Sequence, residues 1–395
     1  MTGNGDGSFG GREVVIVEAA RLPVGRGHEE KGYYKDVHAS NLLSKTYKEL
    51  VERAGINPAE VDDVVAGCVQ QFGEQSLNIG RNAWLEAGLP METPATTVDR
   101  QCGSAQQAVN FAAALIASGV HDVVVGGGVE HMGHISFADS AKVMQEHGMA
   151  FSPQLLERYN LVPQGISAEM IADKWEIPRS ELDEIGLRSH QLAHKATEEG
   201  RFEREIIPFN VNGDTYVTDQ GIRPDTSLEV LSQLKPAFKE DGRVTAGNSS
   251  QVSDGAAAVL LMTREKAEAL GLKPRARIFD QTTVGVDPVI MLTGPIPATR
   301  KLLDRNGMKI DDIDLIEINE AFASVVAAWR RELDPDMDRV NVNGGAIAIG
   351  HPLGSTGARL ITTLLHEMER SDKEMGLVTM CCGGGLGTGT LIQRV

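Results

Sequence analysis

Residues 48–65 read KELVERAGINPAEVDDVV, and residues 300–317 read RKLLDRNGMKIDDIDLIE. Each stretch predicts an amphipathic helix, a glycine, a short connection and an apolar strand that begins with Asp. Gly55 and Gly307 suit the left-handed backbone position that ends a helix, and they lie 252 residues apart. A unit that recurs in this way indicates that the chain is built from two copies of one α/β arrangement.

The same order of elements continues after each copy: a helix, an apolar strand and three glycines. In the first half the predicted segments are a strand at 95–98, a helix at 104–117, a strand at 122–125 and glycines 126–128. In the second half they are a helix at 355–369, a strand at 377–380 and glycines 383–385. Helices that alternate with nearly continuous apolar strands are typical of sheets covered by helices.

The sequence therefore predicts an α/β protein of two equivalent halves, residues 1–128 plus 245–270 and residues 271–395. The segment between them, 129–244, is richer in His, Met, Gln and charged residues and has weaker strand signals. Long insertions after the carboxyl ends of strands form substrate lids in α/β folds, so we expect an inserted substrate domain; the alternative is a solvated decoration. Residues 1–12 are rich in glycine and predict a disordered segment.

The composition excludes several classes of function. The chain has 395 residues and a net charge of −17, whereas non-specific binding to nucleic acid or to an anionic membrane needs a basic surface. No apolar run approaches the roughly 20 residues of a membrane span, and no signal peptide is evident. The 4 cysteines are scattered and do not form a disulfide framework, so we expect the protein in a reducing cytoplasm.

A cysteine stands where the first half changes from strand to helix. Cys102 lies in residues 99–105, which read DRQCGSA. A thiol before a helix lies near the positive end of that helix, which favours the thiolate and makes the sulfur a better nucleophile. The alternative is that Cys102 is a small buried core residue, as most free cysteines are.

The duplication brings further reactive residue types to equivalent places in the second half. These are Asn319 at the end of a predicted strand, His351 in a glycine-rich stretch before a predicted helix, and the pair Cys381-Cys382. Alone, Asn319 is explained as a turn residue and His351 as a core histidine. Because strand ends around a pseudo-twofold axis converge, we expect these side chains and Cys102 to form one site.

No metal and no nucleotide cofactor is predicted. His131 and His134 have a spacing that one face of a helix could offer to a metal, but no third ligand is evident. Cys381 and Cys382 are neighbours on a predicted strand and therefore point to opposite faces. Neither triple glycine has the G-x-G-x-x-G spacing of a dinucleotide site.

Taken together, these segments resemble the thiolase family, and the resemblance covers nearly the whole chain. The matching segments are Cys102-Gly103-Ser104, Gly247-Asn248-Ser249-Ser250, Ser253-Asp254-Gly255-Ala256-Ala257, Asn319-Glu320-Ala321-Phe322-Ala323, the stretch from Gly344 to Gly357 around Gly350-His351-Pro352, and Cys381-x-Gly-Gly-Gly. Residues 72–76, 129–134 and 341–343 are similar to those of bacterial degradative members, including actinobacterial members of lipid and steroid oxidation.

The resemblance implies a thiolase fold, with two half-domains in a five-layer αβαβα core and the insertion as a loop domain that holds coenzyme A. It implies a homodimer or homotetramer that acts on 3-ketoacyl-CoA, with coenzyme A as co-substrate and no cofactor. Arg223 and Ser250 match family positions that contact coenzyme A. Gln101, Cys382 and Leu386 depart from the residues most common at their positions, which leaves the shape of the pocket open.

The resemblance also implies a role for each residue of the site. Cys102 carries the acyl group, and His351 activates it. His351 and Asn319, the latter through a bound water, stabilise charge on a thioester oxygen, while the backbone N–H groups of Cys102 and Gly383 form a second oxyanion hole. Cys381 moves the proton, because the family's pattern of Cys, any residue and three glycines begins at this residue.

The expected activity is cleavage of 3-ketoacyl-CoA by coenzyme A to acetyl-CoA and a shortened acyl-CoA, through an acyl-cysteine, in fatty-acid or steroid side-chain β-oxidation. A close alternative is a biosynthetic acetoacetyl-CoA thiolase that condenses two acetyl-CoA. A decarboxylating ketosynthase is disfavoured, because it would have a second histidine in place of Cys381. A non-catalytic acyl-CoA or sterol carrier would have lost Cys102 or His351, and both are present.

Overall fold

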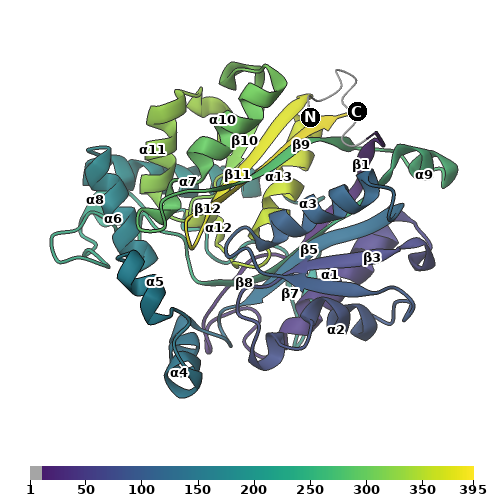
Figure 1. The fold of residues 1–395 in the computed structure, drawn as a ribbon, viewed down its shortest axis with the longest axis horizontal. Coiled ribbons are helices and arrows are strands. Elements are labelled where there is room, and N and C mark those ends of the chain that lie inside the picture. The colour runs from purple at the N-terminus through teal and green to yellow at the C-terminus, as the bar shows by residue number, and fades with distance from the viewer. Residues whose placement is uncertain (1–10) are drawn as a thin grey trace.

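The computed structural model describes residues 11–395, and its main strands form one long sheet (Figure 1). The strands of the first half are β1 (Val14–Arg21), β2 (Gly25–Arg26), β3 (Asp63–Gly67), β4 (Ala95–Val98), β5 (Val123–His131) and β8 (Ser253–Thr263). Those of the second half are β9 (Ala276–Gly285), β10 (Leu315–Ile318), β11 (Met375–Cys382) and β12 (Leu386–Arg394).

The order of the strands confirms the predicted duplication. The first half runs β4-β3-β5-β8-β1 and the second runs β10-β11-β12-β9. In each half one parallel pair, β3 with β5 or β10 with β11, is followed by two antiparallel pairs. The halves join where β1 pairs with β9 at two positions, Val15 with Arg277 and Ile16 with Ala276.

Three helices of each half correspond in chain order, and each half has one further helix without a counterpart. The helices are α1 (Ala39–Ala54), α2 (Ile79–Glu86), α3 (Ser104–Ala117) and α9 (Arg264–Ala269) in the first half, and α10 (Pro295–Asn306), α11 (Ala323–Leu333), α12 (Ala346–Ile349) and α13 (Thr356–Arg370) in the second. Both α1 and α10 end at a left-handed glycine, Gly55 with φ 68° and Gly307 with φ 63°, as predicted.

Alternation of side chains across the strands produces five layers. Val64 of β3 clusters with α1 and α2, whereas Val65 clusters with α3. In the second half, Leu377 of β11 clusters with α10 and α11, whereas Val378 clusters with α3 and α13. The helices α3 and α13 therefore lie between the two half-sheets, and the other helices cover the outer faces. This is the αβαβα arrangement that the family resemblance implies.

The glycines after the predicted strand 122–125 lie within β5, so the expectation that they follow the strand is wrong. The reason is close packing rather than a turn. A Cβ on Gly126 would lie 2.7 Å from the Cα of Val109 in α3, and a Cβ on Gly128 would overlap the Gly354 carbonyl. Glycine here lets the central helix and a loop of the second half approach the sheet.

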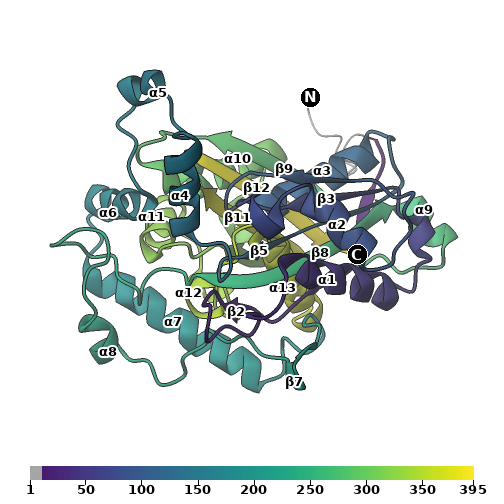
Figure 2. The same cartoon turned by 90° about the horizontal axis from the view of Figure 1, so that it is seen from below.

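The insertion between β5 and β8 is mostly helical. Its elements are α4 (Phe137–His147), α5 (Pro153–Arg158), α6 (Gln164–Lys174), α7 (Arg179–Glu198), β6 (Phe209–Val211), β7 (Asp214–Tyr216) and α8 (Leu228–Ser232). Figure 2 shows α5 standing away from the body, and neither α4 nor α5 has a buried residue.

The predicted limits of the inserted segment, 129 and 244, can be compared with the strands on either side of it. β5 ends at His131 and β8 begins at Ser253. The division into domains itself stays a prediction. The predicted disorder of residues 1–12 concerns residues outside the described range, apart from the last two. Among residues 11–395, no helix has the length and apolar character needed to cross a membrane.

Candidate active site

Cys102 lies in a tight turn between β4 and α3. Gln101 before it has a φ of 50°, in the left-handed region that costs a non-glycine residue about 1 kcal/mol. Ser104 holds the turn, because its hydroxyl donates to the Gln101 carbonyl at 2.6 Å and accepts from the Arg100 N–H at 2.9 Å. A strained backbone conformation of this kind persists where neighbouring groups hold it in place. Here the turn places Cys102 in the interior, with 2% of its surface exposed.

Burial controls the acidity of the Cys102 thiol. It raises the pKa of Cys102 to about 11, with smaller contributions of the same sign from the charges of Glu130 and Asp99. The backbone N–H groups of Gly383 and of Cys102 itself act on the sulfur and lower the pKa, but by less. The predicted influence of the helix start, which favours the thiolate, is therefore outweighed by burial in the resting protein. Cys102 is a thiol until a base takes its proton.

His351 precedes α13 and uses both ring nitrogens. Nδ1 lies 2.7 Å from the Oγ1 of Thr356, whose own proton goes to the Pro352 carbonyl, so this network assigns the imidazole proton to Nδ1. Nε2 lies 3.3 Å from the amide nitrogen of Asn319, a donor, and accepts from it. Burial, and next the positive charge of Arg359, lower the pKa of His351 to about 3. His351 is a neutral imidazole with a lone pair on Nε2.

Asn319 directly follows β10, and its N–H donates to the Thr379 carbonyl of β11 at 3.0 Å. Its side chain is fully buried, and its Oδ1 has no hydrogen-bond partner in the described part of the chain. A buried amide oxygen without a protein partner is a place for a bound water. This is consistent with the water that the family resemblance implies beside Asn319 and His351.

The loop that carries His351 is held by Glu320, a residue of the Asn319 motif with no role predicted from the sequence. The Glu320 carboxylate accepts from the Asn341 side-chain amide at 2.9 Å and from the Ser189 hydroxyl at 2.6 Å. Gly345 packs so closely on this carboxylate that a Cβ would overlap it. An acid next to Asn319 in an apolar stretch was the available signal, but its partners lie far away in the sequence.

The adjacent thiols Cys381 and Cys382 point to opposite faces of β11, as predicted. Burial raises the pKa of each, and Cys102 is the next cause in both, which places Cys102 near both thiols. The sulfur of Cys382 lies in the central layer, 2.6 Å from where a Cβ on Gly103 would be. Cys381 lies on the other face and clusters with Phe322, three residues after Asn319 along the chain. The two thiols are therefore packed in different layers, Cys382 in the central layer and Cys381 in the outer cluster.

Comparison with known proteins gives the family. Residues 14–265 match the family described as Thiolase, N-terminal domain, and residues 272–394 match Thiolase, C-terminal domain. The chain belongs to the thiolase family. It is 46% identical over 401 residues to the steroid 3-ketoacyl-CoA thiolase FadA6 of Mycobacterium tuberculosis, covering 100% of this chain and 97% of that protein.

Two further comparisons agree. This thiolase is 45% identical over 396 residues to a 3-ketoacyl-CoA thiolase of Psychrobacter cryohalolentis, covering 97% of this chain and 98% of that protein. Its fold matches the crystal structure of the Bacillus anthracis acetyl-CoA acetyltransferase with a TM-score of 0.88 and 39% identity, covering 97% of this chain and 99% of that one.

In this thiolase a buried carboxylate ties the two halves together beside the site. Glu130 of β5 accepts from the N–H groups of Val69 and Gly354 at 2.9 Å each, from the Gln70 N–H at 3.1 Å and from the Gln75 side chain at 2.8 Å. Gly354 belongs to the second half, whereas the other three donors belong to the first. In the sequence, Glu130 stands out only as part of the segment 129–134, and no local signal indicates this role.

The two residues predicted to contact coenzyme A lie in different settings. The N–H of Ser250 donates to the Ala321 carbonyl at 2.9 Å, so Ser250 is beside the Asn319 segment. Arg223 is exposed in the insertion, and its backbone N–H donates to His190 at 3.1 Å. Within residues 11–395 no hydrogen bond or ion pair engages the Arg223 guanidinium. Both assignments stay predictions.

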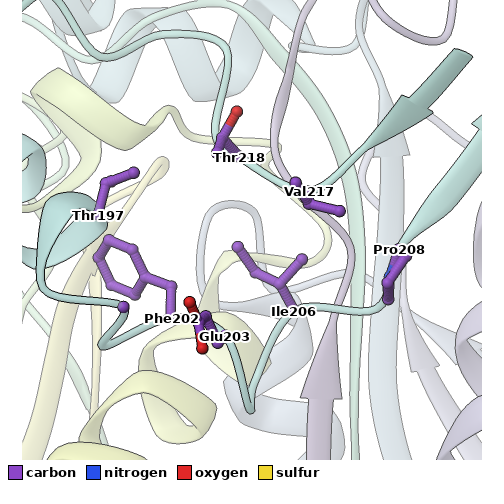
Figure 3. A pocket seen from close by; sticks show the side chains of 8 residues that line it. Thr197, Phe202, Glu203, Ile206, Pro208, Val217 and Thr218 are labelled. Atoms are coloured by element: carbon purple, nitrogen blue, oxygen red, sulfur yellow. The ribbon is translucent and has the colours of Figure 1, made fainter.

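A cavity of about 330 Å³ lies elsewhere, between the end of α7 and the β6–β7 hairpin (Figure 3). Its lining consists of Thr197, Gly200, Phe202, Glu203, Ile206, Pro208, Val217 and Thr218. None of the predicted site residues lines it, so this cavity is separate from the candidate active site.

The structure supplies a third candidate metal ligand that the spacing of His131 and His134 did not reveal. Glu74 brings a carboxylate oxygen within 4.8 Å of a nitrogen of each histidine. However, Nε2 of His131 faces the Tyr34 carbonyl at 3.0 Å, and Nε2 of His134 faces the Lys35 carbonyl at 2.7 Å. The remaining close pair, His134 Nδ1 and a Glu74 carboxylate oxygen, lies within hydrogen-bond distance at 2.7 Å. A metal is therefore not required.

We expect removal of metal ions to leave this thiolase unchanged. Dialysis against a chelator should alter neither the Tm nor the rate of substrate cleavage, because protein groups already pair every ring nitrogen of His131 and His134. Thermal unfolding and steady-state assays before and after dialysis measure this. A fall in Tm that added Zn²⁺ reverses in the natural protein, but not in a Glu74→Gln variant, would contradict the prediction.

Proposed function

We propose that this thiolase cleaves 3-ketoacyl-CoA with coenzyme A, as an acetyl-CoA C-acyltransferase in fatty-acid or steroid side-chain β-oxidation. The observation that carries the proposal is the arrangement around the buried Cys102 thiol. Two backbone N–H groups act on its sulfur and Cys381 lies nearby, while His351 is a neutral imidazole hydrogen-bonded to Asn319. The relatives favour degradation, since those at 45–46% identity are named 3-ketoacyl-CoA thiolases.

The first half of the reaction forms an acyl-enzyme. His351 Nε2 takes the Cys102 proton as the sulfur attacks the 3-keto carbon, and the N–H groups of Cys102 and Gly383 donate to the resulting oxyanion. Loss of one such donor costs a typical enzyme about 2.7–4 kcal/mol of barrier. The Cα–Cβ bond then breaks. The acyl group stays on Cys102, and the electron pair moves into the thioester carbonyl of acetyl-CoA, where protonated His351 and the water at Asn319 meet the enolate oxygen.

In the second half of the reaction, each catalytic residue that gave a proton regains one. Cys381 protonates the enolate carbon, so that acetyl-CoA leaves and Cys381 becomes a thiolate. The thiol of coenzyme A gives its proton to Cys381 and attacks the acyl thioester, and Cys102 leaves and regains its proton from His351. The cycle needs no cofactor, because both transferred groups are carried by sulfur. A covalent intermediate of this kind predicts ping-pong kinetics.

The proposal is tested with 3-ketoacyl-CoAs of graded chain length and one ring-bearing substrate. Mass spectrometry should detect acetyl-CoA, the shortened acyl-CoA and an acyl group on Cys102, and a Cys102→Ser variant should release neither product. Cleavage of none of the substrates, with no acyl group on Cys102, would leave the carrier alternative. Activity on acetoacetyl-CoA alone, with condensation of acetyl-CoA, would favour the biosynthetic alternative.

We also propose that the protein is a cytoplasmic homodimer or homotetramer. The strand before the Cys102 turn, β4, is an edge of the sheet, and in the segments near it Leu77 is 88% and Met91 is 71% exposed. Unpaired strand edges with exposed apolar side chains are typical of interfaces. All the cysteines are free, which suits a reducing compartment. A monomer in sedimentation experiments at micromolar concentration would contradict the assembly.

A further inference from the structure

The second half contains a buried carboxyl group and a buried guanidinium that the steps above do not use. Glu317 lies on β10 and Arg359 on α13, and they are 2% and 1% exposed. Arg359 Nη1 is 3.9 Å from Glu317 Oε2, which is beyond hydrogen-bond distance. All three guanidinium nitrogens and Glu317 Oε2 have no hydrogen-bond partner among residues 11–395.

Charged groups at this depth without protein partners imply water. A guanidinium has five N–H donors, and burying it without acceptors is far more costly than hydrating it. A gap of more than 3.5 Å between polar groups is where a bridging water is expected. The Oδ1 of Asn319, two residues beyond Glu317, is a further buried acceptor without a partner.

The unpartnered atoms lie on the same side of the second half-sheet. Leu315 belongs to the central cluster with α13, whereas Ile316 and Ile318 belong to the outer cluster. Because side chains alternate along a strand, Glu317 and Asn319 project toward α13 as Leu315 does. Glu317, Arg359 and Asn319 therefore face the space between β10 and α13, where buried water would meet all three side chains.

Arg359 is also placed to act on His351. It lies three residues after Thr356, on the same face of α13, and the Thr356 hydroxyl accepts the Nδ1 proton of His351. The charge of Arg359 acts on the His351 ring through the low-dielectric interior. Burial raises the pKa of Glu317 to about 8, and the Arg359 guanidinium acts against this rise and so favours the carboxylate.

We propose that Glu317 and Arg359 are positioning residues: with buried water they fix the Asn319 amide, and the Arg359 charge acts on the His351 imidazole. This inference rests on the proposed function, in which a neutral His351 must accept the Cys102 proton. A nearby cation disfavours protonation of His351 by solvent. During catalysis the imidazolium forms together with an oxyanion, which offsets the repulsion.

Other charges surround the pair. Those near Arg359 are Arg21, Glu205 and Asp219, and those near Glu317 are Glu205, Glu320 and Glu367. Most have their own partners: Arg21 binds Glu205 at 2.6 Å and Asp219 at 2.7 Å, and Glu320 holds the His351 loop. Arg359 is the charge resolved as acting on His351, so it is the one to change.

The experiment compares the two partners of one ion pair. On the acidic side, kcat/KM falls as His351 becomes protonated; the pH of this fall is the acid limb. We expect Arg359→Met to shift the acid limb to higher pH by about one unit or more, because His351 then protonates closer to its ordinary pKa. Arg359→Lys, which keeps the charge, should retain the natural limb, and Glu317→Gln should not raise it. A merely structural pair would instead give parallel losses from Arg359→Met and Glu317→Gln with no movement of the limb, and that result would overturn the proposal.

Arg275→Met is the matched control. Arg275 is a buried arginine that pairs with Glu369 at 2.7 Å and bonds to no residue of the site, so its loss should lower the Tm and leave the acid limb in place. If Arg359→Met does not fold, the double variant Glu317→Leu/Arg359→Met replaces the pair with apolar groups, which proteins often tolerate. It should raise the limb in the same direction.

A readout independent of turnover separates this proposal from the proposed function. In protein labelled with ¹⁵N-histidine, the His351 signal is identified by its absence from a His351→Asn variant. We expect the His351 imidazole to titrate at higher pH in Arg359→Met than in the natural protein. Equal titration in the two would overturn the role of Arg359, even if thiolytic cleavage itself is confirmed.

Discussion

Replacing Cys381 with alanine is expected to slow cleavage of 3-ketoacyl-CoA by about 10²–10⁴-fold, the usual contribution of a positioned acid or base. The site is buried, so solvent cannot readily replace the thiol as proton donor to the enolate carbon. Acyl transfer from a simple acyl-CoA onto Cys102 should persist, because it uses His351 and the two backbone N–H groups. Steady-state cleavage and the acyl mass on Cys102 measure the two effects separately.

Cys382→Ala is the control, since Cys382 is equally buried one residue away on the same strand. It points into the central layer against Gly103, so its loss should change packing and leave turnover within a few fold. If Cys382→Ala blocked turnover and Cys381→Ala did not, the assignment between the two thiols would be wrong.

Replacing Glu130 with alanine is expected to lower the free energy of unfolding by about 4 kcal/mol or more. Four buried donors lose their acceptor at once, and each unsatisfied donor costs about 1–3 kcal/mol. One of them, the Gly354 N–H, links the second half to the first. Glu130→Gln keeps the shape but turns an amide NH₂ toward N–H donors, so we expect an intermediate loss. Urea unfolding measures both variants.

Glu169→Ala provides the comparison for Glu130. Glu169 is also buried and accepts backbone N–H groups of Arg243 and Val244, but these lie in the insertion. We expect it to lower stability while the folded protein still acylates Cys102 at the natural rate. Glu130→Gln should slow acylation as well. Natural stability and natural acylation in Glu130→Gln would show that Glu130 does not join the halves.

Much of the fold could be predicted because its signals are local. Gly55 and Gly307 end their helices where the repeated pattern placed them, and the predicted strand at 95–98 and helix at 104–117 have the bounds of β4 and α3. The length of β5 was not predictable in this way. Its glycines look like a turn in the sequence, and only the approach of Val109 explains them.

The predicted site residues are all buried: Cys102 in the first half, and Asn319, His351 and Cys381 in the second. Their roles remain proposals. Residues that hold the site were missed for a common reason. Glu130 accepts from Gly354, and Glu320 accepts from Ser189, at separations of 224 and 131 residues. Nothing near either acid in the sequence indicates its partners.

The duplication, the family and the residue types of the site could all be predicted from the chain, because spacing, glycine positions and motifs are properties of its sequence. The tertiary structure alone decided which protonation states those residues have. A helix end near Cys102 favours a thiolate, yet burial in the assembled core makes Cys102 a thiol, and burial with Arg359 makes His351 a neutral base. Desolvation and charge from distant segments exist only once the two halves have packed together.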